Sequence, residues 1–213
     1  MNNKSSFDVR VNKTNTNLLG ENVNYLPREK YEEILEYVKN NITHRKLDPI
    51  DIVMIFKISY HAGLRINEVL KLSKSSFDFN RLQINLGNTK TDTNDIASFP
   101  QSFSEELQEY LRIERSNLSR TCLLFPISRQ NIYKWLLKIG KALNIIAWTT
   151  PQNESHEKTK THIFRKCIGK DMLYKKAPLN IIMKKLRHTN LKTTSTYLKL
   201  NLSDVQSWES ENL

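Results

Sequence analysis

Apolar residues recur at helical spacing along most of the chain, and this pattern predicts a mainly helical protein. A first amphipathic helix is expected from Pro27, since proline favours the first helical position and apolar residues line one face from there on. A second helix is expected between Asp48 and Gly63, where a glycine suits the left-handed conformation that closes a helix. A third, short helix is predicted over roughly residues 66–72.

The hydrophobic pattern changes between residues 77 and 99. Apolar and polar positions alternate there around two turn-forming stretches, which predicts a small antiparallel meander. Helical spacing returns around residues 107–111 and again after Ser128, which is expected to cap that helix. A polar loop is predicted at 149–160, followed by three short helices over 161–176, 178–186 and 193–200. The fold class is therefore α+β, mainly α-helical with one small sheet.

The chain of 213 residues fits one domain. We predict a polar, extended lead-in over residues 1–26, a folded domain over 27–200 and an acidic tail over 201–213. Two cysteines cannot form a disulfide framework, so a cytoplasmic location is expected. The chain has no apolar run of 18 residues and no apolar leader core, which argues against membrane spanning and secretion.

The net charge of +11, from 33 Lys and Arg against 22 Asp and Glu, makes a polyanion the leading partner class. Residues 158–200 hold 12 of these basic residues and a single acid, Asp171, so the remainder is neutral with 21 of each sign. A solvated surface usually mixes both signs. The excess is therefore expected to face phosphate groups in one place.

Four residues in this basic region have a distinctive spacing. Two residues separate His162 from Arg165, a further 22 separate Arg165 from His188, and eight separate His188 from Tyr197. This spacing resembles the C-terminal signature of the tyrosine recombinases, also called phage-type integrases.

Two earlier segments extend the resemblance. The stretch HAGLRINEVLKL is similar to the family's first box and supplies Arg65, with Glu68 one helical turn later to hold that arginine in place. Lys90, in the second turn of the predicted meander, matches the family's hairpin lysine. The resemblance covers about residues 27–200 and implies the family's catalytic domain, with a three-stranded antiparallel sheet. It also implies an enzyme, a site-specific DNA recombinase or integrase.

The residue types suit the breakage of a DNA phosphodiester. That reaction needs a nucleophile, a proton donor for the leaving 5′-oxygen and fixed cations around the phosphate. The resemblance implies Tyr197 as the nucleophile, which would form a covalent 3′-phosphotyrosyl link. A phenol has a pKa of about 10, so a base or a cationic pocket must assist it.

The other candidates are expected to act on the same phosphate. Arg65 and Arg165 offer planar forks to the non-bridging oxygens, and His188 would add a hydrogen bond. Lys90 is expected to protonate the departing 5′-hydroxyl, and His162 to act as a base or an orienting donor.

Double-stranded DNA is the expected partner, and basic side chains are expected to contact its backbone. These are Lys166, Lys170, Lys184, Lys185, Arg187 and Lys192. No cofactor and no metal are expected, since neither His162 nor His188 has a His or Cys partner at helical spacing. The resemblance also implies a homo-oligomer, a tetramer in the synaptic complex, and accessory DNA-binding proteins.

The chain departs from the family pattern at three points, one of which is Lys166-Cys167 after Arg165, where the family often has His-Thr. Arg187 stands where the family usually has glycine, so its side chain is expected either to alter the tight turn before His188 or to touch phosphate. Few residues precede Pro27, where most members carry a helical DNA-binding domain, so the chain resembles a catalytic-domain-only member. The acidic tail either docks on a neighbouring subunit or frays.

Two alternative functions use the same fold. One is a type IB topoisomerase-like activity, which reseals the strand it cut. The other is a catalytically idle DNA-binding regulator, and the complete set of six candidate residues argues against it. The sequence does not distinguish an integrase from an invertase or a resolvase.

Overall fold

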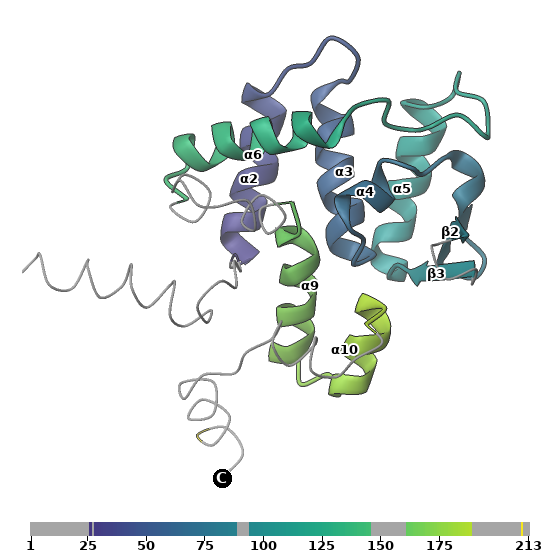
Figure 1. Ribbon diagram of the computed structural model, residues 1–213, viewed down its shortest axis with the longest axis vertical. Helices are drawn as coiled ribbons and strands as arrows, with labels where there is room; N and C mark the ends of the chain where they lie inside the picture. The colour runs from purple at the N-terminus through teal and green to yellow at the C-terminus, as the bar shows by residue number, and fades with distance from the viewer. Residues whose placement is uncertain (1–25, 27, 89–93, 146–160, 189–209, 211–213) are drawn as a thin grey trace, which may run out of the picture.

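The computed structural model describes residues 26, 28–88, 94–145, 161–188 and 210. Its helices are α2 (Arg28–Asn41), α3 (Pro49–His61), α4 (Ile66–Val69), α5 (Gln101–Ile113), α6 (Arg129–Ala142), α9 (Ile163–Tyr174) and α10 (Leu179–Leu186), with a 3-10 turn η1 (Lys74–Ser76). The strands β1 (Phe77–Asp78), β2 (Gln83–Asn88) and β3 (Asn94–Ser98) form one antiparallel sheet in the order β1-β2-β3. The predicted mainly helical fold with a small three-stranded sheet is confirmed (Figure 1). The predicted loop at 149–160 and helix at 193–200 lie outside the described residues.

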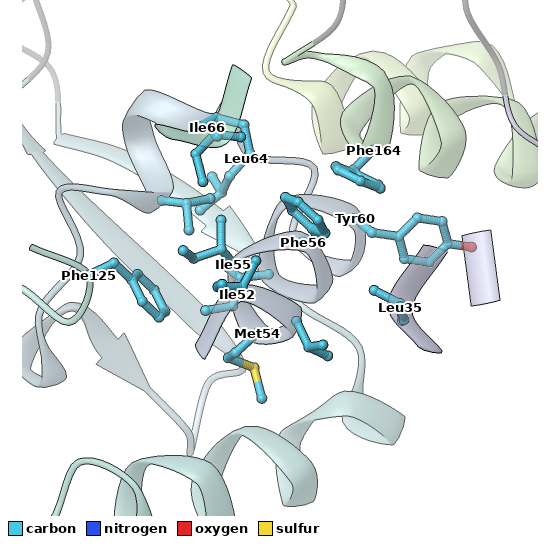
Figure 2. Packing of buried hydrophobic residues seen from close by; sticks show 14 of the residues in the cluster. Leu35, Ile52, Met54, Ile55, Phe56, Tyr60, Leu64, Ile66, Phe125 and Phe164 are labelled. Carbon is cyan, nitrogen blue, oxygen red and sulfur yellow. The ribbon is translucent and has the colours of Figure 1, made fainter. Parts of the chain in front are cut away.

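The core is built around α3, which is buried along most of its length and packs against α2 and α9. Tyr31 of α2 stacks on Tyr60 of α3, with ring centroids 4.5 Å apart. Phe56 of α3 stacks on Phe164 of α9 at the same separation, and Figure 2 shows these two rings facing each other. Apolar burial of this kind stabilises a domain in proportion to the area removed from water. It also fixes α9 directly beside α3.

The start and end of α3 follow from its sequence. Asp48 precedes Pro49, and the Asp48 backbone N–H donates to Asp51 Oδ2 at 2.9 Å, which satisfies an N-terminal donor. Gly63 has φ +64° and donates its N–H to the Tyr60 carbonyl at 3.1 Å, while Leu64 donates to Ser59 at 3.1 Å. These two bonds define a Schellman motif, which confirms the prediction for Gly63.

Two other predicted elements differ in detail. The helix expected over residues 66–72 is α4, which ends at Val69 because i→i+3 bonds replace the α-helical pattern beyond it. Ser128 does precede α6, but its hydroxyl bonds the side chain of Asn131 at 2.7 Å instead of capping a backbone N–H.

The C-terminal described helix, α10, lies beside α9, and the sheet lies near one end of α5 (Figure 1). Ile182 and Leu186 of α10 are fully buried and pack with Ile168 and Met172 of α9. The end of α10 thereby comes close to the α3–α4 turn: a Cβ at Gly63 would lie 3.4 Å from the Lys185 carbonyl oxygen. Among the described helices, none is both long and apolar enough to cross a membrane.

Candidate active site

The first box forms the turn between α3 and α4. Arg65 directly precedes α4 with an extended backbone, at φ −70° and ψ 146°. The carboxylate of Glu68 accepts the Arg65 backbone N–H on Oε2 at 2.7 Å and the Arg65 Nη1 donor on Oε1 at 2.8 Å. One acid therefore starts the helix and holds the guanidinium. The side chain of Arg65 is still 44% exposed, so it is open to a ligand.

Arg165, from the His-x-x-Arg motif on α9, lies in the interior with a side chain that is 1% exposed. Its Nη1 donates to the Gly63 carbonyl oxygen at 2.8 Å, and its Nη2 donates to the carbonyl oxygen of Leu186. Nη1 also lies 3.8 Å from Glu68 Oε2. A single guanidinium thus joins α9 to the α3–α4 turn and to the end of α10.

The turn after α10 places Arg187 and His188. Arg187 has a left-handed backbone, with φ 49° and ψ 46°, and its N–H donates to Lys184 at 3.1 Å. The His188 N–H donates to the carbonyl oxygen of Met183 at 3.0 Å, which completes a second Schellman motif. The tight turn is therefore kept although an arginine stands at the position that glycine usually takes.

The side chain of Arg187 turns back onto two acids. Its Nη2 donates to Glu68 Oε2 at 2.6 Å, and its Nε donates to Asp95 Oδ2 on β3 at 3.0 Å. We call Arg65, Arg165 and Arg187 around Glu68 the arginine cluster. Burial alone would raise the pKa of Glu68, but Arg187 and then the bonds from Arg65 hold it below its usual value. Glu68 is therefore ionised and lies beside the guanidinium groups of all three arginines.

Both candidate histidines border this cluster. Burial, and next the positive charge of Arg165 followed by that of Arg65, lowers the pKa of His162 to about 4. The same causes in the same order, with Arg187 after them, lower the pKa of His188 to about 4. Both imidazoles are therefore neutral at pH 7 in the protein without DNA. A neutral ring has one N–H donor and one acceptor nitrogen, which suits either a base or an orienting donor.

Three of the predicted DNA-contacting lysines have other surroundings in the structure. Lys166 is 7% exposed and Lys170 is fully buried, with its ammonium 5.7 Å from the ring centroid of Tyr174. Lys185 donates to the Ser98 carbonyl oxygen at 2.6 Å, and burial followed by Arg187 lowers its pKa to about 8. Lys166 and Lys170 are therefore buried in this structure, and the ammonium of Lys185 is bound to the end of β3. Lys184 is exposed, as a backbone contact requires.

The structure thus brings Arg65, Glu68, Arg165 and the His188 turn together from three segments of the chain. Lys90, Lys192 and Tyr197 lie outside the described residues, so their predicted roles stay predictions. Sequence reasoning missed Asp95. Its partner Arg187 is 92 residues away, and an aspartate in a meander carries no signal of its own.

Comparisons with known proteins find similar sequences. A profile of the phage integrase family matches residues 24–203. The tyrosine recombinase XerA of Thermococcus kodakarensis is 24% identical over 188 residues, which cover 85% of this chain and 60% of that protein. The type 1 fimbriae regulatory protein FimE of Escherichia coli K12 is 27% identical over 167 residues, 73% of this chain and 78% of that protein. Matches to the first three curated relatives span between 47% and 60% of their length.

Solved structures share the fold. The catalytic domain of bacteriophage HP1 integrase aligns with a TM-score of 0.60 at 16% identity, over 89% of this chain and 95% of that domain. The crystal structure of XerA recombinase aligns with a TM-score of 0.65 at 19% identity, over 88% of this chain and 64% of that one.

Proposed function

The chain belongs to the phage integrase family, and from this membership we propose that it is a site-specific recombinase that cleaves and rejoins DNA. Tyr197 attacks the scissile phosphate and forms a 3′-phosphotyrosyl link, while the 5′-oxygen leaves with a proton from Lys90. The 5′-hydroxyl of another strand then attacks this link and releases the tyrosine. Each exchange conserves one phosphodiester-level bond, so the reaction needs no external energy.

The observation that carries this proposal is the binding of Arg65 by Glu68. Arg65 donates two hydrogen bonds to Glu68, one from its backbone N–H and one from Nη1, and these fix the residue. The Arg65 side chain is 44% exposed, so its guanidinium remains accessible. A preorganised cation is what a pentacoordinate phosphate requires, since charge develops on its non-bridging oxygens in the transition state. Arg165 fixes the segments around this position by its bonds to Gly63 and Leu186.

The neutral histidines complete the assignment. His162, with a lowered pKa, has a free-base ring that accepts the proton of the Tyr197 phenol or orients it. His188 donates a hydrogen bond to a non-bridging oxygen. When the phosphate enters, its negative charge favours protonation of both rings, which adds positive charge as the reaction proceeds.

We propose duplex DNA as the partner and a tetramer as the synaptic assembly. Two structural relatives were solved with DNA: XerH bound to its palindromic difH substrate, and the Tn1549 integrase in complex with transposon right end DNA. In this chain, Lys184 is the exposed cation on α10 that we assign to the DNA backbone, and Lys192 is assigned with it.

Covalent trapping on a nicked suicide duplex from the cognate site tests the proposal. The wild type should form an adduct that survives denaturation, also in excess chelator, and Tyr197→Phe should bind the duplex without forming one. An adduct in Tyr197→Phe would refute the nucleophile, and a strict divalent-ion requirement would indicate another nuclease mechanism. Relaxation of supercoiled plasmid as the sole product would favour the topoisomerase-like alternative. Binding without any wild-type adduct would favour the idle regulator.

A further inference from the structure

We propose that Arg187 is a positioning residue that fixes β3 and the His188 turn against the arginine cluster, and does not itself bind DNA. The proposal rests on the recombinase function proposed above. It assigns to this chain a contact between the sheet and the site that runs through Asp95 and Glu68.

The backbone conformation of Arg187 would favour glycine, so the arginine is best explained by what its side chain contacts. A left-handed conformation is unfavourable for any residue with a Cβ, and glycine would adopt it without this penalty. The turn therefore gains nothing from an arginine, and the benefit must come from the contacts that the guanidinium makes.

Those contacts point inward. The side chain of Arg187 is 9% exposed, and its Nε and Nη2 donors are aimed at Asp95 and Glu68. Its Nη1 is also buried and meets no acceptor within the described part of the chain. The two carboxylates thus determine the orientation of the guanidinium. Because the side chain is largely shielded from solvent, little of it is accessible to a DNA phosphate.

A second contact ties the same two segments together. Lys185, two residues earlier, donates to the Ser98 carbonyl oxygen at the end of β3 at 2.6 Å. The last turn of α10 is therefore attached to β3 at both Ser98 and Asp95. Arg187 extends this attachment to Glu68, the carboxylate that holds Arg65. Loss of Arg187 would leave the bond from Lys185 to Ser98 and remove those to Asp95 and Glu68, which loosens the sheet against the turn that presents His188.

Three variants separate a positioning role from a phosphate contact. Arg187→Gly removes the side chain and suits the left-handed backbone, Asp95→Asn removes the negative charge of its partner on β3, and the double variant combines the two changes. We expect the rate of adduct formation at saturating DNA to fall about 10- to 100-fold in each, as small misplacements at an active site typically cause. The double variant should be no slower than the slower single variant, because the pair acts as a unit. Arg187→Lys should recover part of the rate.

DNA affinity should respond differently. The plot of log K for DNA binding against log salt concentration has a negative slope, and each lost phosphate contact makes that slope shallower by about 0.9. We expect that slope to change in Lys184→Ala, the matched control on the exposed face of α10, and to stay unchanged in Arg187→Gly. A shallower slope in Arg187→Gly with an unchanged cleavage rate would make Arg187 a DNA contact and overturn the proposal. An unchanged rate and slope would overturn it as well.

Hydrogen exchange without DNA tests the attachment independently of activity. Backbone amides in residues 94–98 and 184–188 should exchange faster in both Arg187→Gly and Asp95→Asn than in the wild type, while those of α2 and α3 should not change. Unchanged exchange in both segments would refute the positioning role. If the wild type forms no adduct, the proposed function fails, and this measurement still decides whether Arg187 fixes β3.

Discussion

Arg165 donates from Nη1 to the carbonyl oxygen of Gly63 at 2.8 Å, across 102 residues of sequence. This bond joins the two motifs that the sequence analysis identified separately, the His-x-x-Arg motif on α9 and the Gly-Leu-Arg box before α4. A residue expected to bind a phosphate is therefore also part of the protein interior. Changes at Arg165 should affect both stability and catalysis, which distinguishes it from Arg65.

Arg165→Lys should lower the free energy of unfolding by about 1–3 kcal/mol, because one ammonium cannot reach both carbonyl oxygens and leaves a buried acceptor unpaired. Urea denaturation measures this change. Arg65→Lys is the matched control, since Arg65 is half-exposed, and its effect should stay within about 0.5 kcal/mol. Both variants should lose adduct formation. Equal stability of the two would contradict the interior role of Arg165.

Gly63→Ala should destabilise the protein by about 1–2 kcal/mol, since φ is +64° there and a left-handed backbone disfavours a Cβ. The new methyl group would also lie 3.4 Å from the Lys185 carbonyl oxygen, at the short limit of van der Waals contact, and would fill the space between this turn and the end of α10. Gly87→Ala isolates the backbone effect, because Gly87 has φ +71° with no neighbour within 4 Å among the described residues. Thermal unfolding should show the larger loss for Gly63→Ala, and adduct formation should fall only there. Equal losses of thermal stability in the two variants would mean that the contact between a methyl group at residue 63 and the Lys185 carbonyl oxygen does not destabilise the fold.

The helices were predictable because their signals are local. Pro49 and Gly63 delimit α3, and alternation between residues 77 and 99 indicates the sheet; each of these features depends on neighbours a few positions away. The order and spacing of Arg65, Glu68 and Arg165 resemble a known family, and the structure brings these three candidates together, while their roles stay predictions. Their mutual contacts were predictable only for the i,i+3 pair of Arg65 and Glu68.

The surroundings of the basic residues were not predictable from charge. Lys166 and Lys170 contribute to the basic excess, but both side chains are buried on α9. Arg187 likewise belongs to that excess and is bound by Glu68 and Asp95, whose approach depends on tertiary structure. A count of charges along the sequence therefore overestimates the cations available to DNA.

Lys90→Ala tests the assignment of the proton donor. Without that donor the 5′-oxygen leaves as a poor alkoxide, so adduct formation should fall by about 10²- to 10⁴-fold on an ordinary duplex. A duplex with sulfur at the 5′-bridging position needs no such proton, because a thiol is far more acidic than an alcohol, and it should restore the rate. Arg65→Ala is the control that sulfur should not rescue, since it acts on the non-bridging oxygens. Failure of sulfur to rescue Lys90→Ala would assign the proton to another residue.

The pH dependence of stability should follow three partly buried histidines. Burial first, then nearby cations, lowers the pKa of His61, His162 and His188 to about 4, whereas an unfolded imidazole titrates near 6.5. Between these values the unfolded chain binds more protons, so stability is highest above pH 6.5 and falls as the pH drops toward 4. Calorimetry without DNA should therefore give a lower thermal midpoint at pH 5.5 than at pH 7.5, a range above the ordinary carboxylate titration. His61 stacks on Phe103 with ring centroids 4.4 Å apart, so His61→Phe keeps the stacked ring and should reduce this pH dependence by about a third. An unchanged dependence in that variant would show that His61 is not held neutral by its burial.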